Sequence, residues 1–459
     1  MQNVTVRDIL KASGGTLLCG SEDTYVEHIT IDSRKIAGND IFVPFVGERV
    51  DGHNYIQSAF KNGAAASFSS KRDIPLCEKP IILVDDVMKA MLNTARWYRK
   101  ERIKIPVTGV TGSVGKTSTR EIISRALSAE KNVFSTKGNY NGQIGVPMTM
   151  CDIDNSYEAA VIEMGISLFG EMDNISSVVC ADCAVVTNIG KCHIENLLTQ
   201  ENILTEKLKI ADNMPDGGTL ILNGDDRLLR SCIPDKRLNT VYYGTSPDCR
   251  FKAENITVTG TGTAFDFVLD GKRKAMKLQI AGKHNVMNAL AAFAVCESLG
   301  VDLDAAAERI QTYSGFARRM ERVQCRDYLI IDDAYNASTD SVKAAIDVFS
   351  DLQTNGKKYI VLADMLELGE HAADEHKTIG AYLAGKDIDT AVFIGTLSRY
   401  TAQSARDNAD VEVKCFDSNA EAYEFLKENL IKGDAVLFKG SHSMKLEEII
   451  EKFIQSEEK

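Results

Sequence analysis

The segment VTGVTGSVGKTSTRE, residues 107–121, constrains the fold of this chain more than any other stretch. Residues 105–110 are apolar and partly β-branched, which predicts a buried strand, and the residues from Lys116 onward have the spacing of an amphipathic helix. Gly112 and Gly115 lie in between, where a turn requires positive φ angles or a ligand approaches the backbone. Such a turn directs its amide groups and a helix N-terminus at an anion. The alternative is an ordinary strand–turn–helix junction.

The residue types in this turn suit the phosphates of ATP. Lys116 would reach the β- and γ-phosphates, and the hydroxyl of Thr117 would bind Mg²⁺. The general phosphate-loop pattern has a glycine five positions before Gly115, where this chain has Val110. That difference argues against the generic NTPase classes rather than against ATP. The predicted ATP contacts of the turn are Thr111, Gly112, Ser113, Gly115, Lys116, Thr117 and Ser118.

Composition excludes several classes of protein. A formal net charge of −12 disfavours a general nucleic-acid surface. No apolar run approaches membrane-spanning length, and the N-terminal MQNVTVRDILKASGG lacks the features of a signal peptide. The 11 cysteines have no disulfide-framework spacing, which indicates reduced thiols in a cytoplasmic protein.

One cysteine cluster, CADCAVVTNIGKCH at residues 180–193, admits two interpretations. Cys180, Cys183, Cys192 and His193 are residue types that bind zinc. However, Cys183 begins an apolar run that predicts a buried strand, and no second C-x-x-C follows. Cysteine is also a common core residue. We favour core cysteines and keep structural zinc as the alternative.

The pattern of elements predicts an α/β protein with three domains. Residues 1–84 mix short strands and helices, residues 85–315 contain the phosphate loop and further strands, and residues 316–459 alternate strands with helices. Such alternation implies parallel sheets with right-handed crossovers. We therefore expect a small α/β N-terminal domain, a central P-loop ATPase-like parallel sheet and a C-terminal Rossmann-like domain.

A series of motifs then indicates a family. In chain order they are VTGVTGSVGKTS, TKGNYNGQIGVPMT, VIEMG, TNIGKCHIENL, GKHNVMNALAA, RRME and DDAYNA. This series resembles the Mur ligases, ATP-dependent enzymes that build the peptide of bacterial peptidoglycan precursors, and it covers nearly the whole chain. In that family the phosphate loop is T-G-x-x-G-K-[ST], without the earlier glycine.

Within the family the resemblance favours one branch. The domain that holds the UDP end of the substrate in this family is similar to the N-terminal segment IDSRKIAGNDIFVPFVGERVDGHNYI. The branch that adds D-alanyl-D-alanine to UDP-N-acetylmuramoyl-tripeptide is the one most similar in three further motifs, DDAYNA, ADMLELGE and KGSHSMKLEE. Two positions depart from the pattern, Ala363 in place of glycine and His442 in place of arginine. The alternatives are a family ligase that attaches a single amino acid and a nucleotide switch without ligase chemistry.

The resemblance also implies a mechanism. The γ-phosphate of ATP passes to the tripeptide carboxylate, and the amine of D-Ala-D-Ala attacks the resulting acyl phosphate. Lys116, Glu163, His193 and Lys207 would be catalytic. Glu163, at the end of a predicted strand, and Thr117 would bind a first Mg²⁺. The alternative for Glu163 is an ordinary strand-end acid, and for His193, assigned to a second Mg²⁺ by resemblance alone, a surface histidine.

The catalytic role of Lys207 is supported by the residues around it in the sequence. Ile203, Leu204, Leu208, Ile210 and Ala211 form an apolar stripe at helical spacing, with Lys207 inside the stripe and Lys209 on the opposite face. Burial lowers the pKa of a lysine and provides a neutral amine. The resemblance implies that CO₂ converts Lys207 to N6-carboxylysine, an anionic ligand for the metals.

The resemblance assigns the remaining contacts. Asn285 and Asn288 would bind adenine, although asparagines near a helix start are equally often caps. Arg319, Asp333 and Asn336 would bind the nucleotide from the C-terminal domain, so catalysis would need domain closure. The expected substrate contacts are Ser33, Arg34, Arg49, His53, Asn139, Asn141, Tyr335, Lys439 and Ser441.

The segment DAVLFKGSHSMKLEEIIEKF, residues 434–453, predicts a strand, a short turn and a helix beginning near Ser443. Its turn could hold the carboxylate of D-Ala-D-Ala through Lys439 and Ser441. The alternative is a structural turn with a solvated lysine. We expect a cytoplasmic bacterial enzyme that acts as a monomer.

Overall fold

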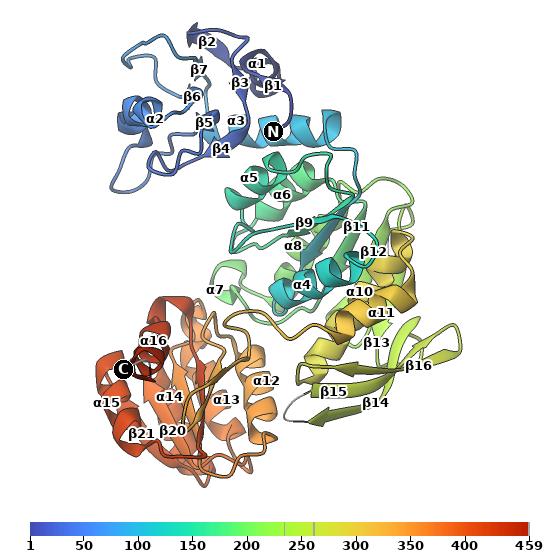
Figure 1. Ribbon diagram of the computed structural model, residues 1–459, viewed down its shortest axis with the longest axis vertical. Coiled ribbons are helices and arrows are strands. Elements are labelled where there is room, and N and C mark those ends of the chain that lie inside the picture. The colour runs from blue at the N-terminus through green and yellow to red at the C-terminus, as the bar shows by residue number, and fades with distance from the viewer. Residues whose placement is uncertain (234, 260–261, 458–459) are drawn as a thin grey trace.

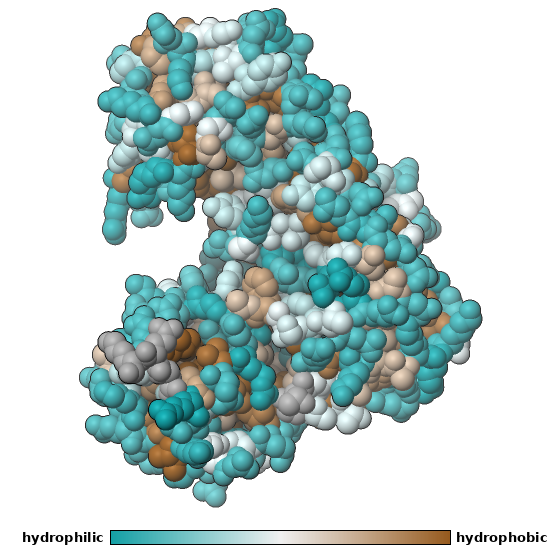
Figure 2. Space-filling model, in the orientation of Figure 1, coloured by the Kyte–Doolittle hydropathy of each residue, from teal (hydrophilic) through white to brown (hydrophobic). Residues whose placement is uncertain are grey.

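Three large sheets follow one another along the molecule (Figure 1). The computed structural model describes residues 1–233, 235–259 and 262–457. The N-terminal, central and C-terminal parts of the chain supply sheets of five, nine and six strands. The space-filling view shows the surface hollowed between the N-terminal and C-terminal parts, beside the central one (Figure 2). This arrangement confirms the predicted α/β architecture.

The N-terminal sheet has the strand order β2-β7-β6-β5-β4. Strands β4 to β7 are parallel, and β2 pairs antiparallel with β7. The elements of this part are β1 (Val4–Thr5), α1 (Val6–Ser13), β2 (Thr16–Cys19), β3 (Tyr25–Val26), β4 (His28–Thr30), β5 (Asp40–Phe42), the 3₁₀ turn η1 (Gly52–Tyr55), α2 (Ile56–Lys61), β6 (Ala66–Ser69) and β7 (Ile81–Leu83).

Helix α3 (Val87–Glu101) joins the first two sheets. Its buried face packs against α1 on one side and against α5 (Gly145–Cys151) and α6 (Glu171–Val179) on the other. The same hydrophobic core therefore extends from the N-terminal sheet into the central one. The boundaries proposed at residues 84 and 315 fall in the loops before α3 and before β17 (Glu321–Gln324).

The central sheet has the order β16-β15-β14-β13-β12-β11-β8-β10-β9. From β9 to β14 all neighbouring strands are parallel, as the sequence predicts. The strands of the parallel part are β8 (Val107–Thr111), β9 (Val133–Ser135), β10 (Ala159–Glu163), β11 (Cys183–Val186), β12 (Thr219–Asn223), β13 (Asn239–Gly244) and β14 (Phe251–Thr259). Its remaining helical elements are α4 (Lys116–Leu127), α7 (Ile194–Leu197), α8 (Gln200–Leu208), η2 (Lys209–Ala211), α9 (Arg227–Arg230), α10 (Lys283–Ser298) and α11 (Leu303–Gln311).

The strand register brings three loops to one edge of this sheet. Val110 on β8 pairs with Glu163 on β10, and Thr111 pairs with Val186 on β11. The chain segments that follow these three strands therefore leave the sheet side by side. The carboxyl ends of neighbouring parallel strands are where α/β folds place ligands.

The far end of the central sheet is antiparallel, which the sequence interpretation did not anticipate. Strand β14 pairs antiparallel with β15 (Gly262–Leu269), which pairs antiparallel with β16 (Lys272–Leu278). More and less buried residues alternate along β14, and the phase of this alternation changes at the register shift between Glu254 and Thr257. A period of two is expected when one face of a strand is covered. Helix α10 covers that face and packs against α4.

The C-terminal sheet is wound on both faces. Its order is β17-β18-β22-β19-β20-β21, parallel except for β17, and two separate hydrophobic clusters lie on its two sides. The elements are β18 (Leu329–Asp332), α12 (Thr339–Ser350), β19 (Lys358–Ala363), η3 (Gly369–His371), α13 (Ala372–Tyr382), β20 (Thr390–Ile394), α14 (Ser398–Asn408), β21 (Glu412–Phe416), α15 (Asn419–Asn429), β22 (Ala435–Lys439), η4 (His442–Met444) and α16 (Glu447–Glu457). The last helix therefore begins at Glu447 rather than near Ser443, because a 3₁₀ turn comes first.

Candidate active site

The predicted phosphate loop lies between β8 and α4, and α4 begins at Lys116. Gly112 and Gly115 have φ angles of 146° and 86°, and a side chain at Gly112 would collide with the hydroxyl of Thr187. The ammonium of Lys116 donates to the carbonyls of Gly112, at 2.8 Å, and Ser113, at 3.2 Å. Glycine is thus required at Gly112 both for its φ angle and for the close approach of β11.

A residue that the sequence interpretation missed, Asn188, braces this loop. Its side-chain oxygen accepts from the amide of Val114 at 2.9 Å, and its side-chain nitrogen donates to the carbonyl of Val114 at 2.8 Å. Its own carbonyl accepts from the amide of Ser113 at 2.9 Å. Asn188 follows β11 in the motif TNIG, so its position beyond a strand end was the available signal.

Thr117 and Glu163 meet beside the loop. The Thr117 hydroxyl donates to Oε1 of Glu163 at 3.1 Å, and Nδ2 of Asn141 donates to the same oxygen at 2.8 Å. Both Thr117 and Glu163 are buried. A hydroxyl and a carboxylate are hard oxygen donors, and Mg²⁺ is usually held by one or two such groups together with substrate phosphates. These residues therefore fit the metal that the sequence predicts.

Arg120, a further residue that the sequence interpretation missed, lies on the other side of that carboxylate. Its Nη1 is 3.4 Å from Oε2 of Glu163, and its side chain is 1% exposed. It also pairs with Glu121 and lies over the ring of Phe316, 5.9 Å from the centroid. Arg120 is one helical turn after Thr117, which was the signal for its side-chain direction.

Lys207 is fully buried at the end of α8. No hydrogen-bond partner for its Nζ occurs among the described residues. Burial, followed by repulsion from Lys116, lowers the pKa of Lys207 to about 7. Lys209 is instead partly exposed and pairs with Asp173 and with the buried Glu206. The two lysines thus have the opposite environments that helical spacing predicts, and Lys207 offers the neutral amine that carboxylation needs.

His193 lies in the loop after β11, at the start of α7. Its Nδ1 is 2.7 Å from Oε2 of Glu367, a residue of the C-terminal sheet's loops. Cys183 is completely buried in β11, as the core interpretation predicts. No group of three or more His, Cys, Asp or Glu side chains placed to hold a metal ion occurs within residues 1–233, 235–259 and 262–457.

A cavity of about 640 Å³ extends from the phosphate loop to the C-terminal sheet. Its lining includes Gly115, Ser118, Asn285, Asn288, Arg319, Asp333 and Lys439. The cavity is therefore lined by some of the residues predicted to contact the nucleotide, from both the central and the C-terminal parts. Asn288 accepts from the Thr119 hydroxyl at 2.8 Å, which holds α10 against α4. Arg319 lies over the ring of Tyr335, with Cζ 4.2 Å from the centroid.

Lys439 and Ser441 do not form an open turn with a solvated lysine. Lys439 is 1% exposed, and its ammonium donates to Asp333 at 2.6 Å and to the carbonyl of Asn336 at 3.1 Å. The hydroxyl of Ser441 is buried and accepts from the amide of Leu366 at 2.9 Å. Both groups are thus engaged within the C-terminal sheet, because β22 lies in its interior.

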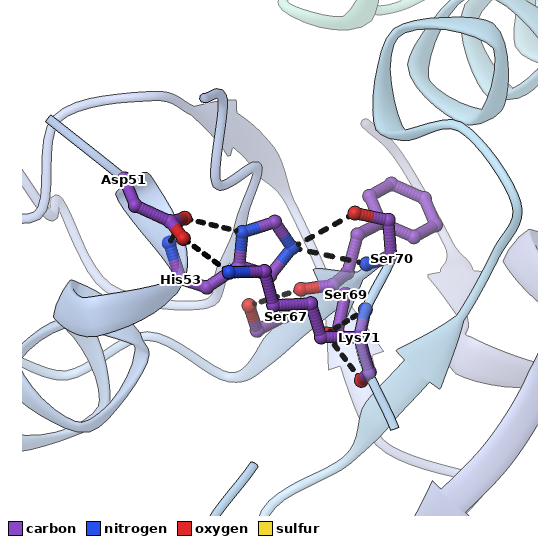
Figure 3. Close-up of polar contacts among 7 residues, drawn as sticks. Asp51, His53, Ser67, Ser69, Ser70 and Lys71 are labelled. Carbon is purple, nitrogen blue, oxygen red and sulfur yellow. Dashed lines mark hydrogen bonds and ion pairs between the residues drawn. The ribbon is translucent and has the colours of Figure 1, made fainter. Parts of the chain in front are cut away.

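The predicted contacts for the UDP end lie apart from this cavity, in the N-terminal part. Arg34 is bound to Asp32 at the surface, and Arg49 is exposed. His53 is buried: Nδ1 is 2.7 Å from Asp51, and Nε2 accepts from the amide of Ser70 at 3.0 Å (Figure 3). Ser33 is buried and its carbonyl accepts from Asn62. His53 therefore joins the loop before η1 to the segment after β6.

Asn139 and Asn141 differ in position. Asn141 reaches Glu163 directly, as described above, whereas Asn139 is exposed and its carbonyl accepts from the amide of Asn141 at 2.8 Å. Asn141 thus links the segment before α5 to the carboxylate at the end of β10.

No helix among the described residues is long and apolar enough to span a membrane.

A phosphate loop lines a cavity between two sheets, and a buried carboxylate beside a hydroxyl lies next to that loop. These features define the class as a nucleotide-dependent enzyme of several domains. Three domain families match the chain: the Mur ligase family catalytic domain over residues 25–99, the Mur ligase middle domain over residues 110–296, and the Mur ligase glutamate ligase domain over residues 318–442. The chain belongs to the Mur ligase family.

Its relatives narrow the comparison to one member of that family. The chain is 37% identical to the UDP-N-acetylmuramoyl-tripeptide–D-alanyl-D-alanine ligase of Bacillus subtilis and 30% identical to that of Escherichia coli, in each case over 98% of both chains. The crystal structure of MurF from Acinetobacter baumannii matches with a TM-score of 0.88 and 27% identity over 98% of both chains. That of MurF from Thermotoga maritima in complex with ADP matches with a TM-score of 0.83 and 26% identity, over 94% of this chain and 98% of that chain.

Proposed function

We propose that this protein is an ATP-dependent amide ligase that adds D-alanyl-D-alanine to UDP-N-acetylmuramoyl-tripeptide through an acyl phosphate. The observation that carries the chemistry is the buried Thr117–Glu163 pair beside a phosphate loop whose residues Gly115 and Ser118 line the cavity. Lys207 lies close enough to Lys116 for that charge to act on it. The choice of substrates rests on the full-length similarity to ligases named for them.

The proposed reaction has two steps, and residues of this chain act in the first of them. Lys116 and Arg319 stabilise negative charge while the γ-phosphate passes to the tripeptide carboxylate and ADP leaves. The amine of D-Ala-D-Ala then attacks the carbonyl carbon, the bond to the phosphate oxygen breaks, and the amine loses a proton as inorganic phosphate departs. Mg²⁺, when bound by Thr117 and Glu163, supplies charge neutralisation for the phosphates.

We also propose that Lys207 carries the CO₂-derived carboxylate that the sequence suggests, and that His193 and carboxylated Lys207 hold a second Mg²⁺. The support is a buried amine with a pKa of about 7 and no hydrogen-bond partner among the described residues. A carboxylated lysine is an anionic oxygen donor, which Mg²⁺ prefers to an amine.

We propose substrate contacts that differ in one respect from those expected from the sequence. The candidates for the UDP end are Arg34, Arg49 and the loop that His53 braces. His53 is buried, so it would support that loop rather than contact the substrate. Asn139 and Tyr335 are exposed enough to meet substrate directly. The enzyme would work as a cytoplasmic monomer on a soluble nucleotide-linked precursor.

The test is phosphate release from ATP with each substrate omitted in turn. We expect release only when both the UDP-tripeptide and D-Ala-D-Ala are present, and none from Lys116→Ala. Steady hydrolysis without acceptor or donor would contradict the proposal in favour of a nucleotide switch. Release with a single amino acid in place of the dipeptide would favour the other ligase branches.

A further inference from the structure

Two carboxylates from the C-terminal sheet hold the loop that carries His193. Oε1 of Glu375 lies 2.7 Å from the ammonium of Lys191, and Oε2 of Glu367 lies 2.7 Å from Nδ1 of His193. The other oxygen of Glu375 accepts from the Thr339 hydroxyl at 2.6 Å, which fixes Glu375 within its own sheet. The loop after β11 is thus attached to the C-terminal part at two points.

The backbone around the His193–Glu367 contact has an unusual conformation. Both residues have φ angles of 61°, in the left-handed region. That region is unfavourable for residues with a Cβ atom and persists where the surroundings hold it, most often at functional sites. Gly369 contributes to the fit, because a side chain there would lie 3.1 Å from Glu195 of α7. The loop after β19 is therefore seated closely on α7.

The charges near Glu367 are those of the candidate active site. Its side chain is 58% exposed and contacts His193 of the central part. The contact with His193 lowers the pKa of Glu367 most, and the more distant Lys116 lowers it further, against the effect of burial. A carboxylate of the C-terminal part thus lies in the field of both the phosphate-loop lysine and the candidate metal-binding histidine.

A carboxylate beside one imidazole nitrogen determines whether the other nitrogen is free to bind a metal ion. With Glu367 beside Nδ1, the proton is favoured on Nδ1, and Nε2 keeps its lone pair. Histidines that bind metals usually have such a partner, and its loss typically reduces metal affinity or activity about 10- to 100-fold.

We propose that Glu367 is a positioning residue for ligation, because its carboxylate orients the imidazole of His193. This imidazole would therefore have its metal-binding orientation only when the C-terminal sheet is docked against the central one. The inference rests on the proposed function and extends it to a residue outside the predicted site. The contact that carries this role is the one between Glu367 and His193.

The first test compares Glu367→Ala and Glu367→Gln with Glu370→Ala. Glu370 is a matched control because it is exposed in the same loop and forms no ion pair with a described residue. We expect Glu367→Ala to lower kcat about 10- to 100-fold with an unchanged KM for ATP and an unchanged Tm. Glu367→Gln, which keeps an oxygen near Nδ1 but removes the charge, should lose less, and Glu370→Ala should match the wild type.

Two further measurements do not depend on turnover. Mn²⁺ affinity, measured by electron paramagnetic resonance with a non-hydrolysable ATP analogue bound, should fall in Glu367→Ala. The ¹⁵N shifts of His193, assigned with a His193→Gln variant, should show the proton on Nδ1 in the wild type and a mixture of tautomers in Glu367→Ala.

Unchanged Mn²⁺ affinity and an unchanged tautomer would overturn the inference, even if KM for D-Ala-D-Ala rose, because Glu367 would then act on that substrate. If the wild type formed no amide product, the proposed function would fail, and these two measurements would still decide the role of Glu367.

Discussion

Lys207 and Lys209 are two residues apart and have opposite surroundings. Lys207 is fully buried, whereas Lys209 is partly exposed and pairs with the exposed Asp173 and the buried Glu206. If Lys207 is carboxylated, Lys207→Ala should be nearly inactive at an unchanged Tm, and small carboxylic acids such as acetate or formate should partly restore ligation by replacing the lost carboxylate. Phosphate release measured with and without the acid checks this expectation.

Lys209→Ala provides the control, because Lys209 is two residues away and its ammonium is already bound to Asp173 and Glu206. Its Tm is measured as well, since the variant leaves the buried Glu206 without this partner. It should retain most of the activity and show no response to the acids. Equal, small effects of both substitutions would contradict the carboxylation of Lys207.

Lys439 has surroundings that its sequence did not reveal. The motif KGS left two interpretations open, a lysine that binds the carboxylate of D-Ala-D-Ala and a solvated lysine in a structural turn. The structure pairs Lys439 with Asp333, and burial lowers its pKa. Removing one partner of a buried pair typically costs about 3–5 kcal/mol, because the other charge is left without compensation.

We therefore expect Lys439→Met to lower the Tm and to raise KM for ATP, since Asp333 lines the nucleotide cavity. The double variant Lys439→Met with Asp333→Asn should recover part of the Tm. Steady-state kinetics with each substrate varied gives the deciding comparison: a rise confined to KM for D-Ala-D-Ala would restore the original interpretation.

At the scale of elements, the phosphate loop depends on the segment that follows the neighbouring strand. Asn188 exchanges two hydrogen bonds with the backbone of Val114, and each typically contributes about 1 kcal/mol. Asn188→Ala should therefore loosen the loop and raise KM for ATP about tenfold, because 1.4 kcal/mol corresponds to a factor of ten.

The control is Asn155→Ala, which removes two exposed side-chain hydrogen bonds, one to the carbonyl of Arg102 and one from the amide of Lys104, away from the cavity. Isothermal titration calorimetry with a non-hydrolysable ATP analogue separates the two variants. An Asn188→Ala protein that bound the analogue as tightly as the wild type would show that the loop holds its shape without this brace.

The order of elements could be predicted from sequence, but several boundaries and one pairing could not. The parallel strands follow from short apolar runs joined by helices, as with β8 and α4. The hairpin β14–β16 was missed, because alternating burial on one face leaves no continuous apolar run. The start of α16 was placed too early, since the 3₁₀ turn η4 has the same local residue pattern as a helix start.

At the scale of the whole molecule, the nucleotide cavity needs both the central and the C-terminal sheets. Lys191 bridges them by its ion pair with Glu375, and a charge reversal there should weaken docking. We expect Lys191→Glu to raise KM for ATP and to increase the radius of gyration measured by small-angle X-ray scattering. The double variant Lys191→Glu with Glu375→Lys should return both quantities toward the wild type.

Lys432→Glu makes the same change of net charge at an exposed position without an ion pair among the described residues, so it should leave both quantities unchanged. A double variant no better than Lys191→Glu alone would show that the bridge does not control docking.

The sequence by itself determined the phosphate loop, the α/β class, the burial of Lys207 and the order of the family motifs. These features depend on local spacing: a glycine turn between a strand and a helix, or a lysine within an apolar stripe. The tertiary structure alone decided that Arg120 lies against Glu163, that Asn188 braces the phosphate loop, that Lys439 is buried with Asp333, and that Glu367 meets His193. Each of these contacts joins residues far apart in the chain or on different elements, and their distances depend on strand register and on how the sheets pack, which no local pattern encodes.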